Sequence, residues 1–321
     1  MKKLFFLVLL GYTSTYAQTQ IGADIDGEAA SDISGRSVSL SSDGTTVAIG
    51  APNNDGSFAN AGSVRVYKNV SGTWTQIGAD IDGEAAYDNS GWSVSLSSDG
   101  TTVAIGAHYN DGSFANEGSV RVYKNVSGTW TQIGADIDGE ATNDYSGLSV
   151  SLSSDGTTVA IGAPYNNGSG TDAGSVRVYK NVSGTWTQIG ADIDGEAPSD
   201  NSGFSVSLSS DGTTVAIGAL YNDGSGTNAG SVRVYDLAAV LSSDSFVLRN
   251  FSIYPNPSNG IVNISLENNL QLEKVTIYNQ LGQVVKTAST NVITTSDLAK
   301  GSYYVVIITN EGKATKQLLI Q

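Results

Sequence analysis

Acidic residues recur in a pattern whose chemistry suits a divalent cation. Four segments read DxDGE and carry a further Asp four residues later. Carboxylate oxygens at this density could bind Ca²⁺, which takes about six to eight oxygen ligands, although the spacing and terminal Glu of an EF-hand loop are missing. The alternative is that these carboxylates accept backbone N–H groups in tight turns. The candidate calcium ligands are Asp24, Asp26, Glu28, Asp32, Asp80, Asp82, Glu84, Asp88, Asp136, Asp138, Glu140, Asp144, Asp192, Asp194, Glu196 and Asp200.

Aromatic side chains form a second group with binding potential. They stand among Asp and Asn in segments that vary while the flanking sequence stays constant. Such rings bind sugars or protein surfaces, because they supply apolar area while neighbouring amides and carboxylates supply directional hydrogen bonds. The alternative is that the rings fill space between neighbouring units. The candidate ligand-binding residues are Tyr87, Trp92, Tyr109, Tyr145, Tyr165, Phe204 and Tyr221.

The chain offers little for catalysis. Its only histidine, His108, stands where other copies of the same pattern have Pro52, Pro164 and Leu220, so no shared mechanism uses it. The paired carboxylates that a glycosidase needs are present, but they occur in every copy, whereas an active site is one asymmetric constellation. No Gly-rich phosphate loop, Ser-His-Asp set or metal triad is found. The sequence therefore predicts a protein that is not an enzyme.

These residues belong to a unit that is repeated over residues 20–235. TQIGADIDGEA, SGxSVSLSSDGTTVAIGA and GSVRVY return every 56 residues, which is typical of propellers, solenoids and arrays. In the first unit, alternation predicts strands over 37–41, 46–51, 63–68 and 74–81, joined by tight turns or long loops. Four up-and-down strands per unit fit a propeller blade. The sequence predicts an all-β fold, a four-bladed β-propeller followed by a small C-terminal β-sandwich.

The phase of the repeat favours a closed ring. Residues 20–25 are equivalent to the last strand of a unit and residues 231–235 to the third, so the N-terminal strand is expected to complete the fourth blade and remove exposed edges. The alternatives are an open stack and a half-ring that pairs with a second chain. Both long connections of each unit, 26–35 and 52–62 in the first, are expected on one face, which carries the variation between units.

The start and composition of the chain predict export. Lys2 and Lys3 precede an apolar run, and small residues precede a cleavage point after Ala17, so residues 1–17 are interpreted as a secretory signal peptide. No apolar run approaches the roughly 20 residues of a transmembrane helix. Cysteine is absent, so neither a disulfide nor a cysteine-borne lipid is expected. Residues 18–239 carry 26 acids and 8 bases, a negative field that repels nucleic acid and anionic lipid.

The pattern SGxSVSLSSDGTTVAIGA followed by GSVRVY resembles the FG-GAP propeller repeat of integrin α-chain heads and many bacterial exported proteins, over residues 20–235. The resemblance implies a propeller used for extracellular binding and adhesion. Two features depart from it: Phe-Gly is replaced by Gly-Arg, Gly-Trp, Gly-Leu or Gly-Phe, and the hairpin that binds calcium in integrins is only SSDGTT. This hairpin has too few ligands for calcium, so the family's metal site does not transfer.

After a linker over residues 240–250, short alternating strands in residues 251–321 predict the β-sandwich. YPNP, NISL, VTIYNQLGQVV, LxxGxYxVxI and a terminal KQLLI closely resemble, in this order, the C-terminal sorting domain (type A) of type IX secretion cargo in Bacteroidetes-like bacteria. The resemblance implies the type IX secretion machinery as a partner, passage through the periplasm and outer membrane, removal of the tail and attachment to surface lipopolysaccharide. The sorting-signal residues are Tyr254, Pro255, Asn256, Pro257, Gly301, Tyr303 and Lys316.

The expected function is binding outside the cell. We expect a secreted or cell-surface adhesion protein whose variable face binds an extracellular carbohydrate or protein. A structural spacer of the surface layer and a glycan-active enzyme are the alternatives. Variation confined to one face favours binding, because a spacer has no reason to vary one face.

Overall fold

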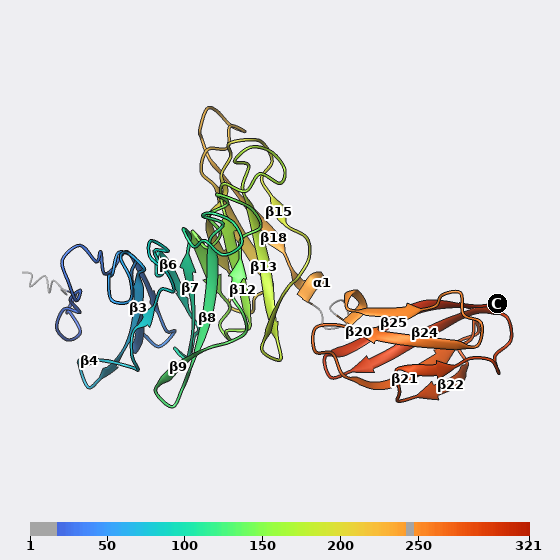
Figure 1. The fold of residues 1–321 in the computed structure, drawn as a ribbon. Coiled ribbons are helices and arrows are strands. Elements are labelled where there is room, and N and C mark those ends of the chain that lie inside the picture. Colours follow the sequence, from blue (N-terminus) through green and yellow to red (C-terminus); the bar gives the residue numbers. More distant parts are fainter. Residues whose placement is uncertain (1–17, 242–246) are drawn as a thin grey trace, which may run out of the picture.

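The structure of the protein is a computed structural model that describes residues 18–241 and 247–321. The predicted signal peptide, residues 1–17, lies outside the described residues, as does part of the predicted linker. Figure 1 shows a row of sheets formed by the repeats and, beyond helix α1 (Ala238–Leu241), a separate sandwich.

Each of the first three repeats forms one antiparallel sheet. In the first sheet, β1 to β4 lie in sequence order and the short β5 pairs with the start of β3, so the predicted outer strand is split in two. The fourth repeat forms three strands, and α1 follows where the other repeats have their outer strand. The strands of the repeats are β1 (Ser37–Leu40), β2 (Thr46–Ala51), β3 (Ser63–Val70), β4 (Thr73–Gln76), β5 (Ile81–Asp82), β6 (Ser93–Leu96), β7 (Thr102–Ala107), β8 (Ser119–Val126), β9 (Thr129–Gln132), β10 (Ile137–Asp138), β11 (Ser149–Leu152), β12 (Thr158–Ala163), β13 (Ser175–Val182), β14 (Thr185–Gln188), β15 (Ile193–Asp194), β16 (Ser202–Leu208), β17 (Thr214–Ala219) and β18 (Ser231–Asp236).

The second strand of each of the first three sheets is buried along its whole length. Its sequence TVAIGA alternates branched apolar side chains with Ala and Gly, so one side of the strand is bulky and the other is small. The small side lets the next repeat come close, since a Cβ placed on Gly50 would lie 2.0 Å from the carbonyl oxygen of Gly91. Glycine is therefore required there for consecutive sheets to pack.

An apolar core fills the space between consecutive sheets. Between the first and second sheets, Val64 and Val66 of β3 pack with Val94 and Leu96 of β6. The Leu96 N–H also donates to Ser39 Oγ at 2.9 Å across the same gap. Equivalent clusters lie between the second and third sheets and between the third and fourth. One interface is thus repeated along the row.

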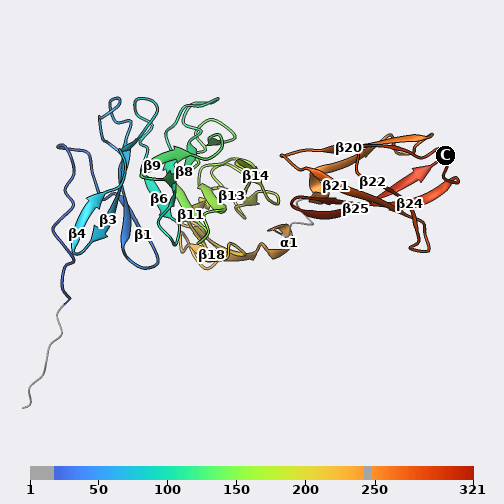
Figure 2. The same ribbon diagram turned by 90° about the horizontal axis from the view of Figure 1, so that it is seen from below.

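The row of sheets stays open at both ends. Val38 and Leu40 on β1 are 65% and 58% exposed, whereas the equivalent Val94 and Leu96 are 9% and 7% exposed. Figure 2 labels β1 in the first sheet of the row and β18 in the last.

At the other end, the third strand of the fourth sheet is equally exposed to solvent. Val232 and Val234 are 70% and 65% exposed, whereas their equivalents Val176 and Val178 are 0% and 2% exposed. Among the described strands, β18 pairs only with β17.

The predicted ring-closing strand is wrong, because residues 20–25 pack on their own repeat. They form no strand, and Trp74 Nε1 donates to the Ile21 carbonyl at 2.8 Å. Trp130 makes the same bond to the Ile77 carbonyl at 2.7 Å, so the N-terminal segment takes the place that the inter-repeat connection takes elsewhere. The propeller type of all-β fold is confirmed, whereas closure by the chain's own ends is not formed.

The C-terminal part is the predicted sandwich of two antiparallel sheets. Its core contains Phe251, Val262, Ile277, Val305 and Leu318, all nearly inaccessible to solvent. One sheet has the order β19-β20-β23 and the other β22-β21-β24-β25. The strands are β19 (Phe251–Tyr254), β20 (Ile261–Leu266), β21 (Leu272–Tyr278), β22 (Val284–Ala288), β23 (Val292–Thr294), β24 (Gly301–Thr309) and β25 (Gly312–Ile320).

Candidate functional site

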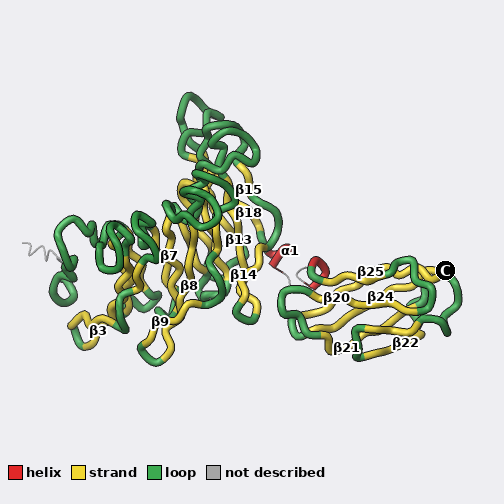
Figure 3. Tube along the Cα trace, in the orientation of Figure 1, coloured by secondary structure: helices red, strands yellow, loops and turns green. Residues whose placement is uncertain are grey.

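The long connections of the repeats gather at one end of the sheets (Figure 3). Within the first repeat, the buried Asp32 carboxylate joins them, because it accepts the Asn54 amide at 2.9 Å and the Ala29 N–H at 3.0 Å. Asp88, Asp144 and Asp200 make the same pair of contacts in the other repeats, and all are buried. This end of the row is thus held rigid by buried carboxylates and can present side chains in fixed positions.

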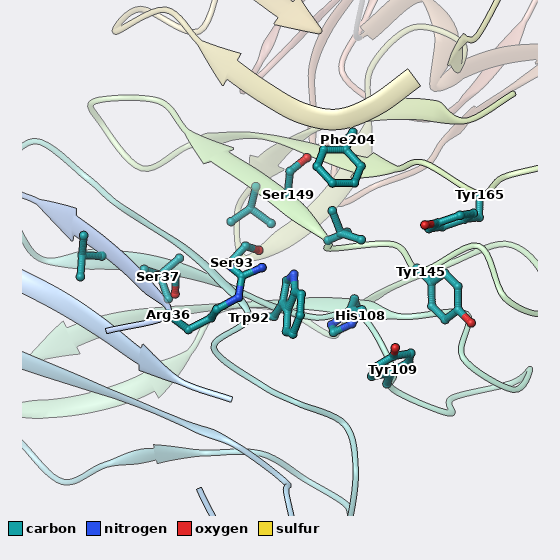
Figure 4. Close-up of a pocket in the computed structure, with 14 residues that line it drawn as sticks. Arg36, Ser37, Trp92, Ser93, His108, Tyr109, Tyr145, Ser149, Tyr165 and Phe204 are labelled. Atoms are coloured by element: carbon teal, nitrogen blue, oxygen red, sulfur yellow. The ribbon is translucent and has the colours of Figure 1, made fainter. Parts of the chain in front are cut away.

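A hollow of about 750 Å³ lies beside the innermost strands, β1, β6 and β11, where they enter this end. We call it the aromatic groove. Figure 4 shows its labelled side chains, which come from all four repeats. Its lining residues are Arg36, Ser37, Val38, Trp92, Ser93, Val94, His108, Tyr109, Tyr145, Leu148, Ser149, Val150, Tyr165 and Phe204.

The rings of the groove form one continuous run. The centroid of Trp92 lies 4.2 Å from His108, and His108 lies 4.0 Å from Tyr109. Tyr109 meets Tyr145 edge to face at 5.3 Å, and Tyr145 meets Tyr165 in the same way at 5.1 Å. Ring pairs at these separations stabilise one another. The run is therefore a preformed apolar surface rather than a set of independent side chains.

One cation stands at the end of this run. The guanidinium carbon of Arg36 lies 4.0 Å from the centroid of the Trp92 ring, within the range of a cation–π contact. Arg36 itself is exposed. The groove therefore places a positive charge and five N–H donors beside an aromatic surface.

His108 lies in the middle of the run and is buried, with 3% of its surface exposed. Burial and, to a smaller extent, the positive charge of Arg36 together lower its pKa to about 3. The imidazole is consequently neutral at physiological pH, and its Nδ1 has no hydrogen-bond partner in the described structure. His108 serves here as a polar aromatic ring with one free nitrogen.

The centre of the groove departs from the repeat at two matched positions. Asn89 donates to the Pro52 carbonyl at 2.7 Å, and Asn201 donates to the Pro164 carbonyl at 2.8 Å. Between the second and third repeats, the same two positions hold Tyr145 and His108.

Tyr145 also stands in the left-handed region, with φ of 53°. Asn tolerates this conformation, but a bulky aromatic residue rarely adopts it. Ile33 and Tyr87 share this conformation, with φ of 56° and 71°, so the conformation alone does not distinguish Tyr145. The paired change from Asn and Pro to Tyr and His is what singles out the junction of the second and third repeats.

Five of the seven predicted binding residues line the groove, and two do not. Trp92, Tyr109, Tyr145, Tyr165 and Phe204 belong to its lining. The other two, at positions 87 and 221, lie outside the lining and are exposed.

Sequence reasoning missed two groove residues, Arg36 and His108. His108 is the only histidine and was expected to be incidental. The signal that identifies it is its joint departure with Tyr145 from a repeat that otherwise hardly changes.

Several of the predicted calcium ligands form hydrogen bonds or ion pairs with other side chains of the protein. Asp80 accepts Gln76 at 2.6 Å, and Glu84 lies 3.4 Å from Arg121. Among residues 18–241 and 247–321, no three acidic or histidine side chains come close enough together to hold a metal ion. Calcium binding in these loops stays a prediction.

Carboxylates of consecutive repeats also meet one another. Burial raises the pKa of Glu28, and the negative charge of Asp80 in the next repeat raises it further. Burial likewise raises the pKa of Glu84 and Glu140, with Asp136 and Asp192 adding to the rise against nearby arginines. The junctions between repeats therefore disfavour the charged form of these glutamates.

The predicted sorting-signal residues hold the sandwich together at one end. Asn256 accepts the Leu319 N–H at 2.9 Å and donates to the Gln317 carbonyl at 2.8 Å, which joins the YPNP turn to the last strand. Lys316 donates to the Phe251 carbonyl, and the buried Tyr303 donates to the Ala299 carbonyl at 2.7 Å. The first and last segments of the domain thus fold together, with Tyr254 exposed beside them.

Together, the sheets and the sandwich define a propeller-type repeat protein with an appended C-terminal domain. Residues 79–123, 135–179 and 191–235 match the family of the FG-GAP repeat, and residues 252–321 match the secretion system C-terminal sorting domain. The chain therefore contains FG-GAP repeats and a type IX sorting domain, which directs it to the cell surface or the medium. No helix within the described ranges is long and apolar enough to cross a membrane.

Comparison with other proteins adds only distant likenesses. No curated protein matches the chain. Among solved structures, hydrazine synthase of Kuenenia stuttgartiensis has a TM-score of 0.42 at 14% identity, covering 94% of this chain and 70% of its own. The periplasmic gluconolactonase PpgL of Pseudomonas aeruginosa has a TM-score of 0.40 at 15% identity, covering 88% and 85%. At TM-scores below 0.5, nothing about the activity of this chain follows from either protein.

Proposed function

We propose that this exported chain is an adhesion protein that binds carbohydrate in the aromatic groove. The observation that carries the proposal is the unbroken run of rings from Trp92 to Tyr165, with Arg36 at its end. The C–H faces of a sugar ring pack on such a surface, while its hydroxyl groups need directional polar partners. Arg36 can donate to them, and Ser37, Ser93 and Ser149 in the lining can accept from them.

The chemistry of the groove supports binding over hydrolysis. A glycosidase needs two carboxyl groups flanking the scissile bond, and the described lining contains no Asp or Glu. The imidazole of His108, whose pKa burial lowers to about 3, has no proton to give a leaving group at neutral pH.

The asymmetry of the groove supports binding over a purely structural role. A spacer built from identical repeats needs the same contact at every junction. Here the junction that holds His108 and Tyr145 differs from the two junctions that hold Pro and Asn. Both exchanged residues line the groove, and a spacer has no reason to carry this difference.

A glycan and matrix-protein array probed with the purified chain tests the proposal, and calorimetry measures the Kd of the glycan that binds. Tyr109→Ala should weaken binding by about 2 kcal/mol, roughly thirtyfold in Kd, because aromatic anchors dominate such interfaces. Tyr87→Ala is the matched control, since Tyr87 is 65% exposed and lies outside the groove lining. Equal losses from both changes, or binding of a matrix protein and no glycan, would refute a carbohydrate site in the groove.

A further inference from the structure

We infer that the chain associates head to tail with a second copy of itself, the fourth sheet of one copy packing on the first sheet of the other. The two open ends are the halves of the interface already present three times within the chain. We call the bare side of the first sheet, with Val38 and Leu40 at its centre, the front face. We call the bare side of the fourth sheet, with Val232 and Val234 at its centre, the back face. The front face shares Val38 with the lining of the aromatic groove, so the association is tested by mass in the absence of any glycan.

The apolar residues of the two faces match the interface that consecutive sheets form within the chain. Between the first and second sheets, Val64 and Val66 pack against Val94 and Leu96. At the ends, the corresponding residues are the same types: Val232 and Val234 on the back face, Val38 and Leu40 on the front face. All four are between 58% and 70% exposed in the single chain. A second copy would bury them in the arrangement that the internal junctions already use.

The polar groups of the two faces match as well. In the internal junctions, Ser37 Oγ donates to the Gly91 carbonyl at 2.7 Å, and the Ser42 N–H donates to the Ser98 carbonyl at 2.9 Å. Gly62 forms a parallel bridge with Ser90. The back and front faces carry the corresponding groups. The joint would therefore form the same hydrogen bonds and satisfy polar groups as well as bury apolar ones.

The back face also has the shape that is needed to accept another repeat. At Gly50, Gly106 and Gly162, a side chain would collide with the backbone of the following repeat at 2.0 Å. Gly218 keeps this glycine although no repeat follows it, and a Cβ there would meet only its own Ser205. A hollow of about 540 Å³, lined in part by Gly218, Gly230 and Val232, lies where the next repeat would sit.

Within residues 18–241, neither end has the polar cap that a free repeat array needs. Repeat proteins carry atypical terminal repeats with a polar outer face, because a bare interface is an aggregation hazard. In this chain the terminal repeats keep the apolar residues of the internal ones. Helix α1 covers only the outer margin, where Val240 lies 3.6 Å from the Cβ position of Gly190, and it leaves Val232 bare.

One contact across the joint involves a positive charge, although the repeat region as a whole is acidic. Arg36 stacks on Trp92, which holds the same position in the next repeat. In a head-to-tail pair, Arg36 of one copy would come next to Phe204 of the other, which is 39% exposed. The contact would add a second cation–π pair to the one with Trp92, so Arg36 would have an aromatic partner on both sides.

Both faces belong to every copy, so two copies can close on each other through two identical joints. The closed pair would be a ring of eight sheets, within the usual range of about four to eight blades for propellers. Light scattering after size exclusion should therefore give twice the mass of the chain at micromolar concentration. Because the joint brings Glu196 of one copy to Asp24 of the other, as Glu28 meets Asp80 within the chain, dissociation should decrease with added salt.

Two variants and their mixture test the direction of the joint. Val38→Asp removes the front face and Val232→Asp removes the back face, so each variant alone should run at the mass of the single chain. An equimolar mixture should regain the doubled mass, because the intact back face of the first fits the intact front face of the second. Val126→Asp, at a residue that is 58% exposed on another strand, is the matched control and should keep the doubled mass.

Three outcomes would overturn the inference. They are a wild-type chain that runs as a monomer at all concentrations, a mixture that stays monomeric, and a Val126→Asp variant that dissociates like the other two. Far-ultraviolet circular dichroism of each variant establishes that it is folded, and Ser at the same position, as in Val38→Ser or Val232→Ser, replaces any Asp variant that is not.

Discussion

Replacing the same valine in two repeats should give opposite results. Val120 and Val232 hold equivalent positions, but Val120 is fully buried whereas Val232 is 70% exposed. Val120→Ala removes two methyl groups, each contributing about 0.8 kcal/mol when buried, and leaves a cavity that adds to the loss. We expect the free energy of unfolding to fall by about 2 kcal/mol for Val120→Ala and by less than about 0.5 kcal/mol for Val232→Ala.

Urea denaturation followed by tryptophan fluorescence measures both changes. All four tryptophans lie within the repeats, so the signal reports the row of sheets and not the sandwich. The experiment is done at a protein concentration at which the chain is monomeric, since a second copy would cover Val232. Because arrays of repeats can unfold in steps, the midpoints of the first transition are compared. Equal losses for the two variants in the monomer would show that the fourth sheet is covered by its own chain and that the row is closed.

Three further predictions concern pH, calcium and export. Glu28, Glu84 and Glu140 have raised pKa values in the folded chain, so deprotonation costs stability and the urea midpoint should rise as pH falls from 7 toward about 5. Below about pH 4 it should fall, because hydrogen bonds lower the pKa of Asp43 and Asp211 to about 2 in the folded chain, so the unfolded chain takes up protons first; a midpoint that falls steadily from pH 7 would contradict this order. If calcium binds the DxDGE loops of the folded chain, the Tm should rise with millimolar Ca²⁺ and fall back with chelator, and an unchanged Tm would remove calcium. Deleting residues 251–321 should leave the chain folded in the periplasm, whereas a reporter that carries the signal peptide and this tail but stays periplasmic in a host with a working type IX system would contradict the export role of the tail.

The repeat fold could be predicted from the sequence because its signals are local and recur in every repeat. Alternation in SVSL and GSVRVY and the Gly-containing turns placed the strands within a few residues of their observed bounds. Closure failed because it depends on the angle between sheets, which no local pattern encodes. Residues 20–25 have the sequence of an inter-repeat connection and pack as one, held by Trp74.

The aromatic groove could be predicted in part. Its aromatic residues were identifiable because they vary within a constant frame. Their grouping was not, since Tyr109 belongs to the second repeat and Tyr145 and Tyr165 to the third, and the rings of the two repeats meet only because consecutive sheets pack closely. Tyr87 shows the limit of the argument, because it shares the loop type but points outside the groove lining.

The repetition of one interface along the row has a consequence for how the gene can change. Every junction joins the same two surfaces, so gain or loss of one 56-residue unit creates no contact that the protein does not already make. Unequal recombination between near-identical coding units would then alter the length of the array by whole sheets and still yield a folded product. The junction that holds His108 and Tyr145 is the exception, because a crossover within it would separate the two residues and return that junction to the common pattern.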